Sequence, residues 1–246
     1  MFRVKMVSLV LLLAFVVSCN FTEEIFLEEN GSGKISINFD GSELMQMGGD
    51  EMMGGSEKAI DSTLSFKKFL EEKKDSIATL SPEKQAKLKD LEPFNLHMLM
   101  NPETKEMKFD MYADFDNIDE VGDAFSAFQN MDALNPTGNA NQPGFLSNDS
   151  ESSEVAYGFK NNTFSRKAKI LNAELHQKAV DSLAGAEMFL AGSTYTLKYH
   201  FPKRVKSASV EEATFSADGK TMIYEVGFLE LMKNPEILNL EVELEQ

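Results

Sequence analysis

The chain has 246 residues, of which 42% are hydrophobic, so it can bury a sizeable core as one large or two small domains. Its 40 acidic and 24 basic residues give a formal net charge of −16. This surplus excludes nucleic acid as an expected partner, because Lys and Arg are needed to neutralise phosphates, and it disfavours broad adhesion to anionic lipid. A single cysteine excludes an intrachain disulfide.

The N-terminal segment has a basic start with Arg3 and Lys5, an apolar run at 7–17 and a small residue, Ser18. This order is typical of a secretory signal peptide. The apolar run is too short to span a bilayer, which needs ~20 residues of helix. We therefore predict that residues 1–18 are removed, which would take the remaining chain to a net charge of −18.

The only cysteine, Cys19, directly follows Val16-Val17-Ser18. This arrangement resembles the lipobox of bacterial lipoproteins. The resemblance implies cleavage between Ser18 and Cys19 and acylation of Cys19, and two acyl chains are enough for stable membrane anchoring. The alternative is a buried thiol that merely follows a signal peptide.

Residues 19–24 are predicted to be the lipidated N-terminus and a short tether. The pair Glu23-Glu24 resembles the surface-export signals of lipoproteins in the Bacteroidota, and the alternative is the acidic start of a first strand. In general character the chain resembles uncharacterised outer-membrane lipoproteins of the Bacteroidota. This resemblance implies an outer-membrane location, with the periplasmic and surface faces both open.

The first half of the chain begins with a predicted hairpin at 24–40, whose turn is Asn30–Gly33. The Met- and Gly-rich segment 41–59 disfavours a continuous helix, since glycine costs ~1 kcal/mol relative to alanine. Apolar residues at helical spacing predict a helix over 62–80. A second helix begins at Ser81-Pro82, with serine as the cap.

A second predicted hairpin at 94–113 precedes a helix at 118–128. Residues 132–153 are rich in Asn, Pro, Gly and Ser, which predicts an exposed loop. A third alternating segment at 155–170, which turns at Asn161-Asn162, precedes a helix at 172–190. The tail is predicted to be strands at 193–201, 205–215, 221–228 and 236–245.

A hairpin followed by a helix thus occurs three times. This order predicts an α+β fold, with antiparallel sheet built of hairpins and helices packed mainly on one face. We expect residues 25–246 to form the ectodomain, as one domain or as two ββα-type halves separated by the loop near 132–153.

Methionines suggest one metal site, because thioethers with histidine suit Cu(I). Alternation places Met98 and Met100 on the apolar face of their strand and the intervening histidine on the other face. Methionines also fill irregular gaps in a core or bind adaptable apolar partners, and we predict no metal or other cofactor. The weak candidate ligands are Met45, Met47, Met52, Met53 and His97.

The acidic run at 114–123 resembles a calcium loop but fails the EF-hand pattern, because Ile118 and Asp119 occupy its fifth and sixth positions. Calcium in another geometry stays open. The alternative is that Asp116 or Asn117 caps the following helix. No nucleophile elbow, HExxH or dinucleotide motif is present, so no catalytic residue is predicted.

These observations predict a lipid-anchored cell-envelope protein with a non-catalytic binding or scaffolding ectodomain. Its partners would be the membrane, through acyl chains on Cys19, and another envelope protein. The first alternative is a carrier of an apolar small molecule between sheet and helices, with residues 45–53 as a flexible lid. This alternative requires a large apolar cavity. The second is a carboxylate-based hydrolase, which requires a cleft that brings two acids together, one with a strongly raised pKa.

Overall fold

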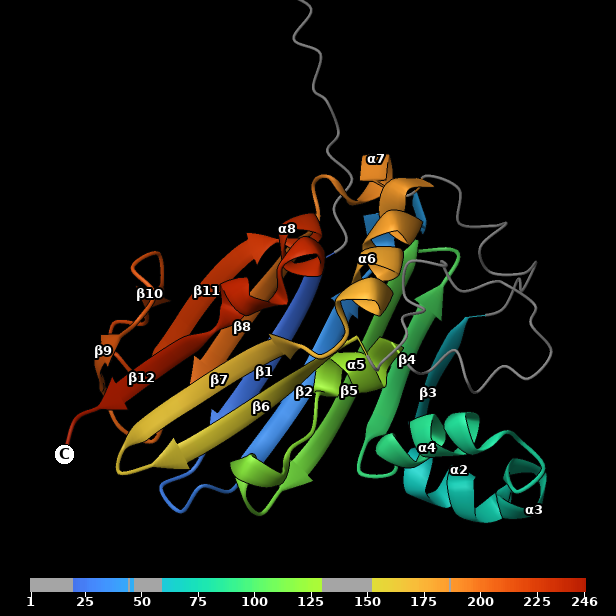
Figure 1. Ribbon diagram of the computed structural model, residues 1–246, viewed down its shortest axis with the longest axis horizontal. Helices are drawn as coiled ribbons and strands as arrows, with labels where there is room; N and C mark the ends of the chain where they lie inside the picture. The colour runs from blue at the N-terminus through green and yellow to red at the C-terminus, as the bar shows by residue number, and fades with distance from the viewer. Residues whose placement is uncertain (1–19, 44, 47–58, 130–151, 186) are drawn as a thin grey trace, which may run out of the picture.

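The computed structural model describes residues 20–43, 45–46, 59–129, 152–185 and 187–246. These residues form two β-sheets with helices between and beside them (Figure 1). The prediction of an α+β fold with antiparallel sheet built of hairpins is confirmed, and the structure adds one parallel strand pair, β1 and β8.

The larger sheet has eight strands, and all neighbouring pairs are antiparallel except β1 and β8. β1 therefore lies in the interior of the sheet, hydrogen-bonded on both sides. In spatial order the strands are β10 (Thr214–Phe215), β11 (Thr221–Gly227), β8 (Thr194–His200), β1 (Asn20–Leu27), β2 (Gly33–Asp40), β5 (Glu106–Phe115), β4 (Asn95–Asn101) and β3 (Ile60–Ser65).

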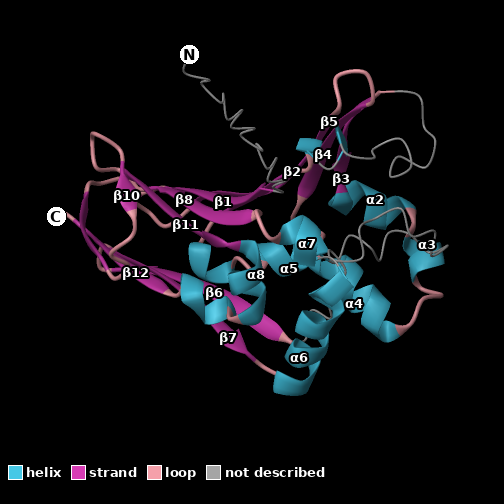
Figure 2. Ribbon diagram, turned by 90° about the horizontal axis from the view of Figure 1, so that it is seen from above, coloured by secondary structure: helices cyan, strands magenta, loops and turns pink. Residues whose placement is uncertain are grey.

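The smaller sheet is antiparallel throughout and faces part of the larger sheet (Figure 1). Seen from above, the two sheets approach each other near the C-terminus and diverge towards the helices (Figure 2). The space between the diverging ends is filled by helices. In spatial order the strands are β6 (Ser153–Lys160), β7 (Thr163–Ile170), β12 (Leu240–Leu244) and β9 (Val205–Ala208).

The helices lie on the same side of the larger sheet as the smaller sheet does (Figure 2). α5 and α8 lie between the sheets, while α2, α3 and α4 lie near the β3 edge (Figures 1 and 2). The α-helices are α2 (Phe66–Glu72), α3 (Lys74–Ile77), α4 (Pro82–Asp90), α5 (Ala124–Gln129), α6 (Ala173–Ser182), α7 (Glu187–Leu190) and α8 (Phe228–Lys233), and the 3₁₀-helices are η1 (Ile118–Glu120), η4 (Leu183–Gly185) and η5 (Pro235–Leu238).

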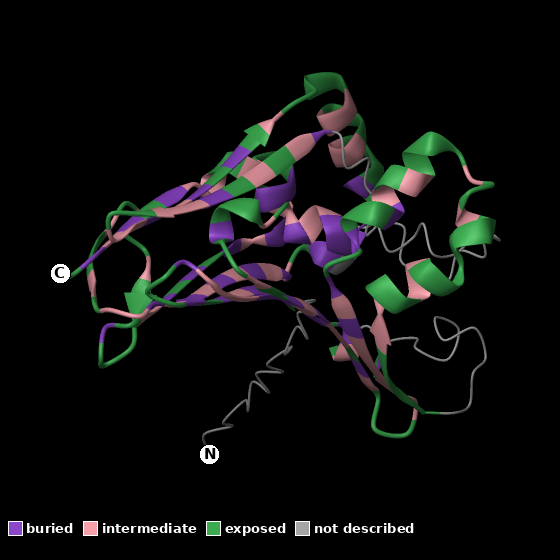
Figure 3. Ribbon diagram, turned by 90° about the horizontal axis from the view of Figure 1, so that it is seen from below, coloured by how far each residue is buried: buried purple, intermediate pink, exposed green. Residues whose placement is uncertain are grey.

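The core lies between the sheets, where alternate strand residues are buried (Figure 3). In β1 the inward residues Phe21, Ile25 and Leu27 are buried, whereas Phe26 on the outer face is 43% exposed. Phe21 stacks on Phe228 of α8, with ring centroids 4.7 Å apart. Aromatic rings thus join the larger sheet to the helices above it.

The predicted hairpins are present, with Asn161 and Asn162 both at positive φ in the β6–β7 turn. The helix predicted from residue 62 is wrong for Ser62–Ser65, which belong to β3 and pair with β4. The helices predicted at 118–128 and 172–190 are each interrupted into shorter segments. α8 was not predicted, although Phe228, Leu231 and Met232 have the spacing of a buried helical face.

Residues 20–24, predicted to form part of a short tether, lie instead in β1. The larger sheet combines strands from both sides of the segment 132–153, because β1 and β2 share it with β8 and β11. One continuous cluster of buried apolar residues joins the two parts of the chain. Ser152 and Ser153 are the part of the predicted loop that the structure describes, and Ser153 begins β6.

Candidate functional site

A buried ion pair joins the two sheets. Glu23 of β1 is fully buried and Arg166 of β7 is 2% exposed. The guanidinium of Arg166 donates from Nε to Oε1 of Glu23 at 3.2 Å and from Nη2 to Oε2 at 3.1 Å. This two-point geometry is the strongest form of an Arg–carboxylate pair.

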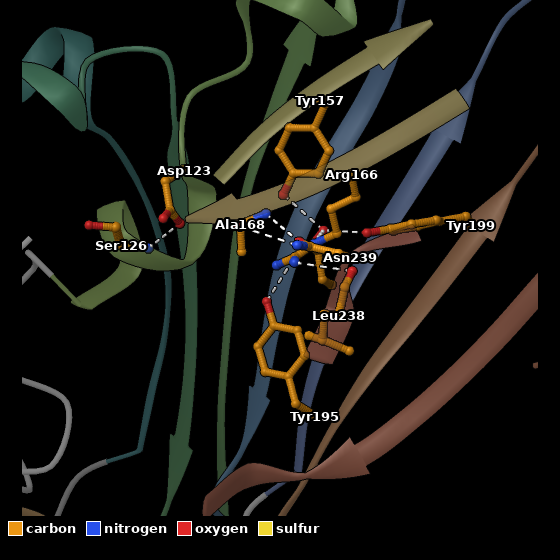
Figure 4. Close-up of polar contacts among 10 residues, drawn as sticks. Asp123, Ser126, Tyr157, Arg166, Ala168, Tyr195, Tyr199, Leu238 and Asn239 are labelled. Carbon is orange, nitrogen blue, oxygen red and sulfur yellow. Dashed lines mark hydrogen bonds and ion pairs between the residues drawn. The ribbon is translucent and has the colours of Figure 1, made fainter. Parts of the chain in front are cut away.

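Three tyrosines complete the coordination of the Glu23 carboxylate. Tyr157 donates to Oε1 at 2.8 Å, Tyr195 donates to Oε2 at 2.8 Å, and Tyr199 also donates to Oε1. Arg166 donates further to the carbonyl of Leu238 at 3.5 Å. The tyrosine and arginine side chains converge from different strands (Figure 4).

Burial by itself would raise the pKa of Glu23, but the charge of Arg166 and the donated hydrogen bonds outweigh it, so the pKa lies below its ordinary value. Burial likewise disfavours the charged form of Arg166, and Glu23 reverses this and raises the arginine pKa. Both groups are therefore charged. Because Glu23 and Arg166 bond to each other, to the three tyrosines and to the carbonyl of Leu238, we interpret this cluster as the structural connection between the sheets.

This cluster was not predicted from the sequence, because Glu23 was assigned to an export signal or to the acidic start of a first strand and not to the core. The alternation of side chains along a strand could have located this residue. Glu23 lies two residues from Phe21 and two from Ile25, so its side chain is on the same buried face of β1 as theirs. Arg166 lies in the same way between buried Phe164 and Ala168.

A small cavity of about 50 Å³ lies beside the ion pair, lined by residues that include Arg166, Tyr195, Ser126 and Gln129. It can hold a few water molecules at most. Gln129 is 5% exposed, and its Nε2 has no hydrogen-bond partner in the part of the chain that the structure describes. This cavity is too small for an organic ligand, since ligand pockets run to ~300–1,000 Å³.

Asp123 forms the boundary between this cavity and a much larger groove, because its side chain lines both. Its Oδ1 accepts a hydrogen bond from the N–H of Ser126 at 2.8 Å at the start of α5 (Figure 4). Burial is the main cause that raises the pKa of Asp123 to about 6, and the hydrogen bond from Ser126 opposes it. A proton can therefore be gained or lost here near neutral pH.

The groove has a volume of about 910 Å³ and runs between α4 and the wall formed by residues 120–127 and the start of β6. Among the residues that line it, the β6 wall carries Glu120, Asp123 and Glu154 and no basic side chain. The opposite wall carries both signs of charge. Its ionisable residues are Lys67, Lys87, Lys89, Glu83, Asp90 and Glu92.

The weak candidate ligands of a methionine–histidine site are not brought together among the residues described. Met45 is buried in the core, whereas His97 lies on the outer face of the larger sheet, 2.9 Å from Oδ1 of Asp61. Met47, Met52 and Met53 lie outside the described residues. Within the described ranges, no group of three His, Cys, Asp or Glu side chains is arranged to hold a metal ion.

The acidic run at 114–123 serves local structure. Asn117 accepts from the N–H of Asp119 at 3.1 Å, as expected of a cap. Asp119 itself accepts from the N–H of Phe159 at 3.1 Å and so binds the edge of β6. The run therefore stabilises the turn that leads into α5.

Ser18 and Cys19, the predicted cleavage and lipidation residues, lie outside the described residues. None of the helices described is long and apolar enough to cross a membrane. The fold and site thus define a two-sheet α+β protein with a filled interior and a charged groove. Comparison with protein families, with curated proteins and with solved structures finds no match to this chain.

Proposed function

We propose that this protein is a lipid-anchored cell-envelope protein whose ectodomain binds a protein partner through the charged groove and performs no catalysis. Acyl chains on Cys19 would hold it to the outer membrane. β1 begins at Asn20, so an anchor on Cys19 would be joined directly to an interior strand of the larger sheet. The ectodomain would therefore lie close to the membrane, without a flexible spacer.

The groove is the observation that carries the proposal. It offers about 910 Å³ of space that opens to solvent, and its walls are mostly charged. Charged walls suit a polar macromolecular partner, because an apolar ligand would leave these groups desolvated. They fit an apolar cargo poorly.

The interior cavity disfavours the carrier alternative. Its volume is only about 50 Å³, and Arg166, Asp123 and Gln129 form part of its lining, so it is too small for an organic cargo. Met45, part of the lid that a carrier would need, packs in the core instead.

We expect Cys19→Ala to abolish acylation and, in chains from which residues 1–18 have been removed, membrane attachment, because such a chain without acyl groups keeps no hydrophobic anchor. Detergent-phase partitioning of the full-length protein measures this directly, and mass spectrometry of the wild-type N-terminus identifies the acyl chains. Cross-linking in intact cells should then capture a defined set of envelope proteins with the wild type and not with Cys19→Ala.

The matched control is Ser8→Ala, which changes the apolar run and leaves Cys19 in place. Retention in the detergent phase of Cys19→Ala chains that lack residues 1–18 would contradict the lipid anchor. Failure of the wild type to capture any specific protein would contradict the binding role.

A carboxylate-based hydrolase is the second candidate, and one observation favours it. Asp123 and Asp90 both line the groove, and burial raises the pKa of each, that of Asp123 to about 6. Such a carboxyl could act as a general acid near neutral pH.

We expect purified protein to hydrolyse nitrophenyl glycosides and esters no faster than the Asp123→Asn variant does. The test compares initial rates of the two proteins over the same panel of substrates. Turnover by the wild type that disappears in Asp123→Asn, with Asp114→Asn on the outer face of the larger sheet as an active control, would favour the hydrolase over the binding protein.

A further inference from the structure

We propose that the partner binds by adding an extended, lysine- or arginine-bearing segment to the free edge of β6. This inference rests on the proposed function, since it names how the groove is occupied. It follows from the main-chain pattern of β6 and from the charges that border it.

β6 is an edge strand, because the smaller sheet has the order β6-β7-β12-β9. Its hairpin to β7 closes with Lys160 opposite Thr163 across the two-residue turn Asn161-Asn162. In such a hairpin the closing pair is hydrogen-bonded, and hydrogen-bonded and non-hydrogen-bonded pairs then alternate along the two strands. The even-numbered residues of β6 therefore bond to β7. The main-chain N–H and C=O groups of residues 153, 155, 157 and 159 point away from β7.

One contact confirms this direction independently. The N–H of Phe159 donates to Oδ1 of Asp119, which lies in η1 beyond the free edge. Asp119 thus closes the edge at its C-terminal end. No contact of this kind is formed by the outward N–H of Val155 within the described ranges, so no described residue covers the edge towards the start of β6.

The groove adjoins this open portion, because Ser153 and Glu154 line it. An extended chain placed there would pair with Ser153 and Val155, as in recognition by strand addition. The main-chain bonds would provide affinity, and alternate side chains would provide specificity.

The charges beside the open edge select the side chains of the incoming segment. Glu120, Asp123 and Glu154 all border the groove on this wall, and no basic residue accompanies them there. Lysine or arginine in the added segment would therefore be attracted, whereas an acidic segment would be repelled. Lys169 lies across from Glu154 on β7 and is the nearest opposing charge in the ladder.

The experiment uses the full mature chain, purified from membranes in detergent, and a fluorescent peptide of alternating lysine and threonine. Val155→Pro removes the outward N–H and leaves the β6–β7 bonds intact, since proline is tolerated on an edge strand. We expect Val155→Pro to weaken peptide binding about tenfold, and bound peptide to slow hydrogen exchange at Val155 in the wild type.

Thr63→Pro is the matched control on β3, the edge of the larger sheet. The N–H of Phe66 donates to the carbonyl of Phe94, so by alternation the N–H of Thr63 points away from β4. We expect this variant to bind the peptide as the wild type does. A peptide with methylated main-chain nitrogens should bind weakly, and one of alternating glutamate and threonine should not bind.

Equal binding by Val155→Pro and the wild type would overturn strand addition. This holds even if the peptide slows hydrogen exchange at other groove residues, because the groove would then bind the peptide in another way. Equal weakening by Thr63→Pro would show that the loss does not depend on the β6 edge and would also overturn it. Absence of peptide binding would overturn the inference. The Cys19-dependent capture described above tests the binding role separately.

Discussion

Arg166→Met is expected to lower the free energy of unfolding by about 3–5 kcal/mol, because it leaves the charge of Glu23 buried without its partner. The three tyrosine hydroxyl groups remain as donors to the carboxylate, but they carry no compensating charge. Chemical denaturation of the full chain, with the midpoint and slope both fitted, measures the change.

Lys167→Met is the matched control, one residue along β7. Its ammonium is 3.5 Å from Glu241, but both side chains are more than half exposed, and such pairs contribute at most about 1 kcal/mol. The double variant Glu23→Leu with Arg166→Met should recover much of the loss, since a buried ion pair often exchanges for apolar residues at little cost. A loss in Arg166→Met no larger than that in Lys167→Met would contradict the role assigned to the ion pair.

The Glu23–Arg166 ion pair also predicts how acid lowers the stability of the protein. The pKa of Glu23 is lowered in the folded state, so its stabilisation is complete above its ordinary value of 4.5 and is lost as the pH falls through the folded pKa. The double variant lacks this contribution. We therefore expect its stability to fall less steeply with acid than that of the wild type.

Asp123→Asn is expected to raise the free energy of unfolding at about pH 8 by roughly 1–3 kcal/mol. Burial raises the pKa of Asp123 from 3.8 to about 6, so the folded state holds its proton over a pH range in which the unfolded state has lost it. Stability consequently declines as the pH rises through 6. Asparagine cannot ionise, and it can still accept the hydrogen bond from the N–H of Ser126.

The gain in the free energy of unfolding of Asp123→Asn should shrink as the pH is lowered from about 8 towards 4. At the lower pH the wild-type carboxyl becomes protonated in the folded and the unfolded state alike. Denaturation at several pH values measures this trend, with Asp119→Asn as a control, because Asp119 also accepts a main-chain bond but lies on the exposed side of η1. A gain independent of pH, or a loss at every pH, would contradict the raised pKa of Asp123.

Much of the fold could be predicted from local patterns. Alternation and turn residues located the hairpins β1–β2, β4–β5 and β6–β7, because strand period and turn chemistry depend on neighbouring residues. The β3 segment could not be found in this way. Ser62–Ser65 form a strand because β4 offers an edge to pair with, and the paired residues of β4 lie 30 to 36 positions further along the chain.

The site could be predicted only in part. Alternation in β1 would have placed Glu23 in the core, but its partner Arg166 lies 143 residues along the chain. The groove is lined by residues from Lys67 to Leu171, and only the folded arrangement brings them to one place. The raised pKa of Asp123 likewise depends on its burial beside the cavity next to Arg166, which local sequence does not specify.

Site-specific photo-cross-linking in intact cells tests the central claim most directly. A photoreactive residue is placed at Glu154, in the groove, and separately at Asp114, which is exposed on the outer face of the larger sheet. The account predicts that the Glu154 position captures a defined envelope protein and that the Asp114 position does not. Capture of the same proteins from both positions, or of none from Glu154, would contradict a partner-binding role for the groove.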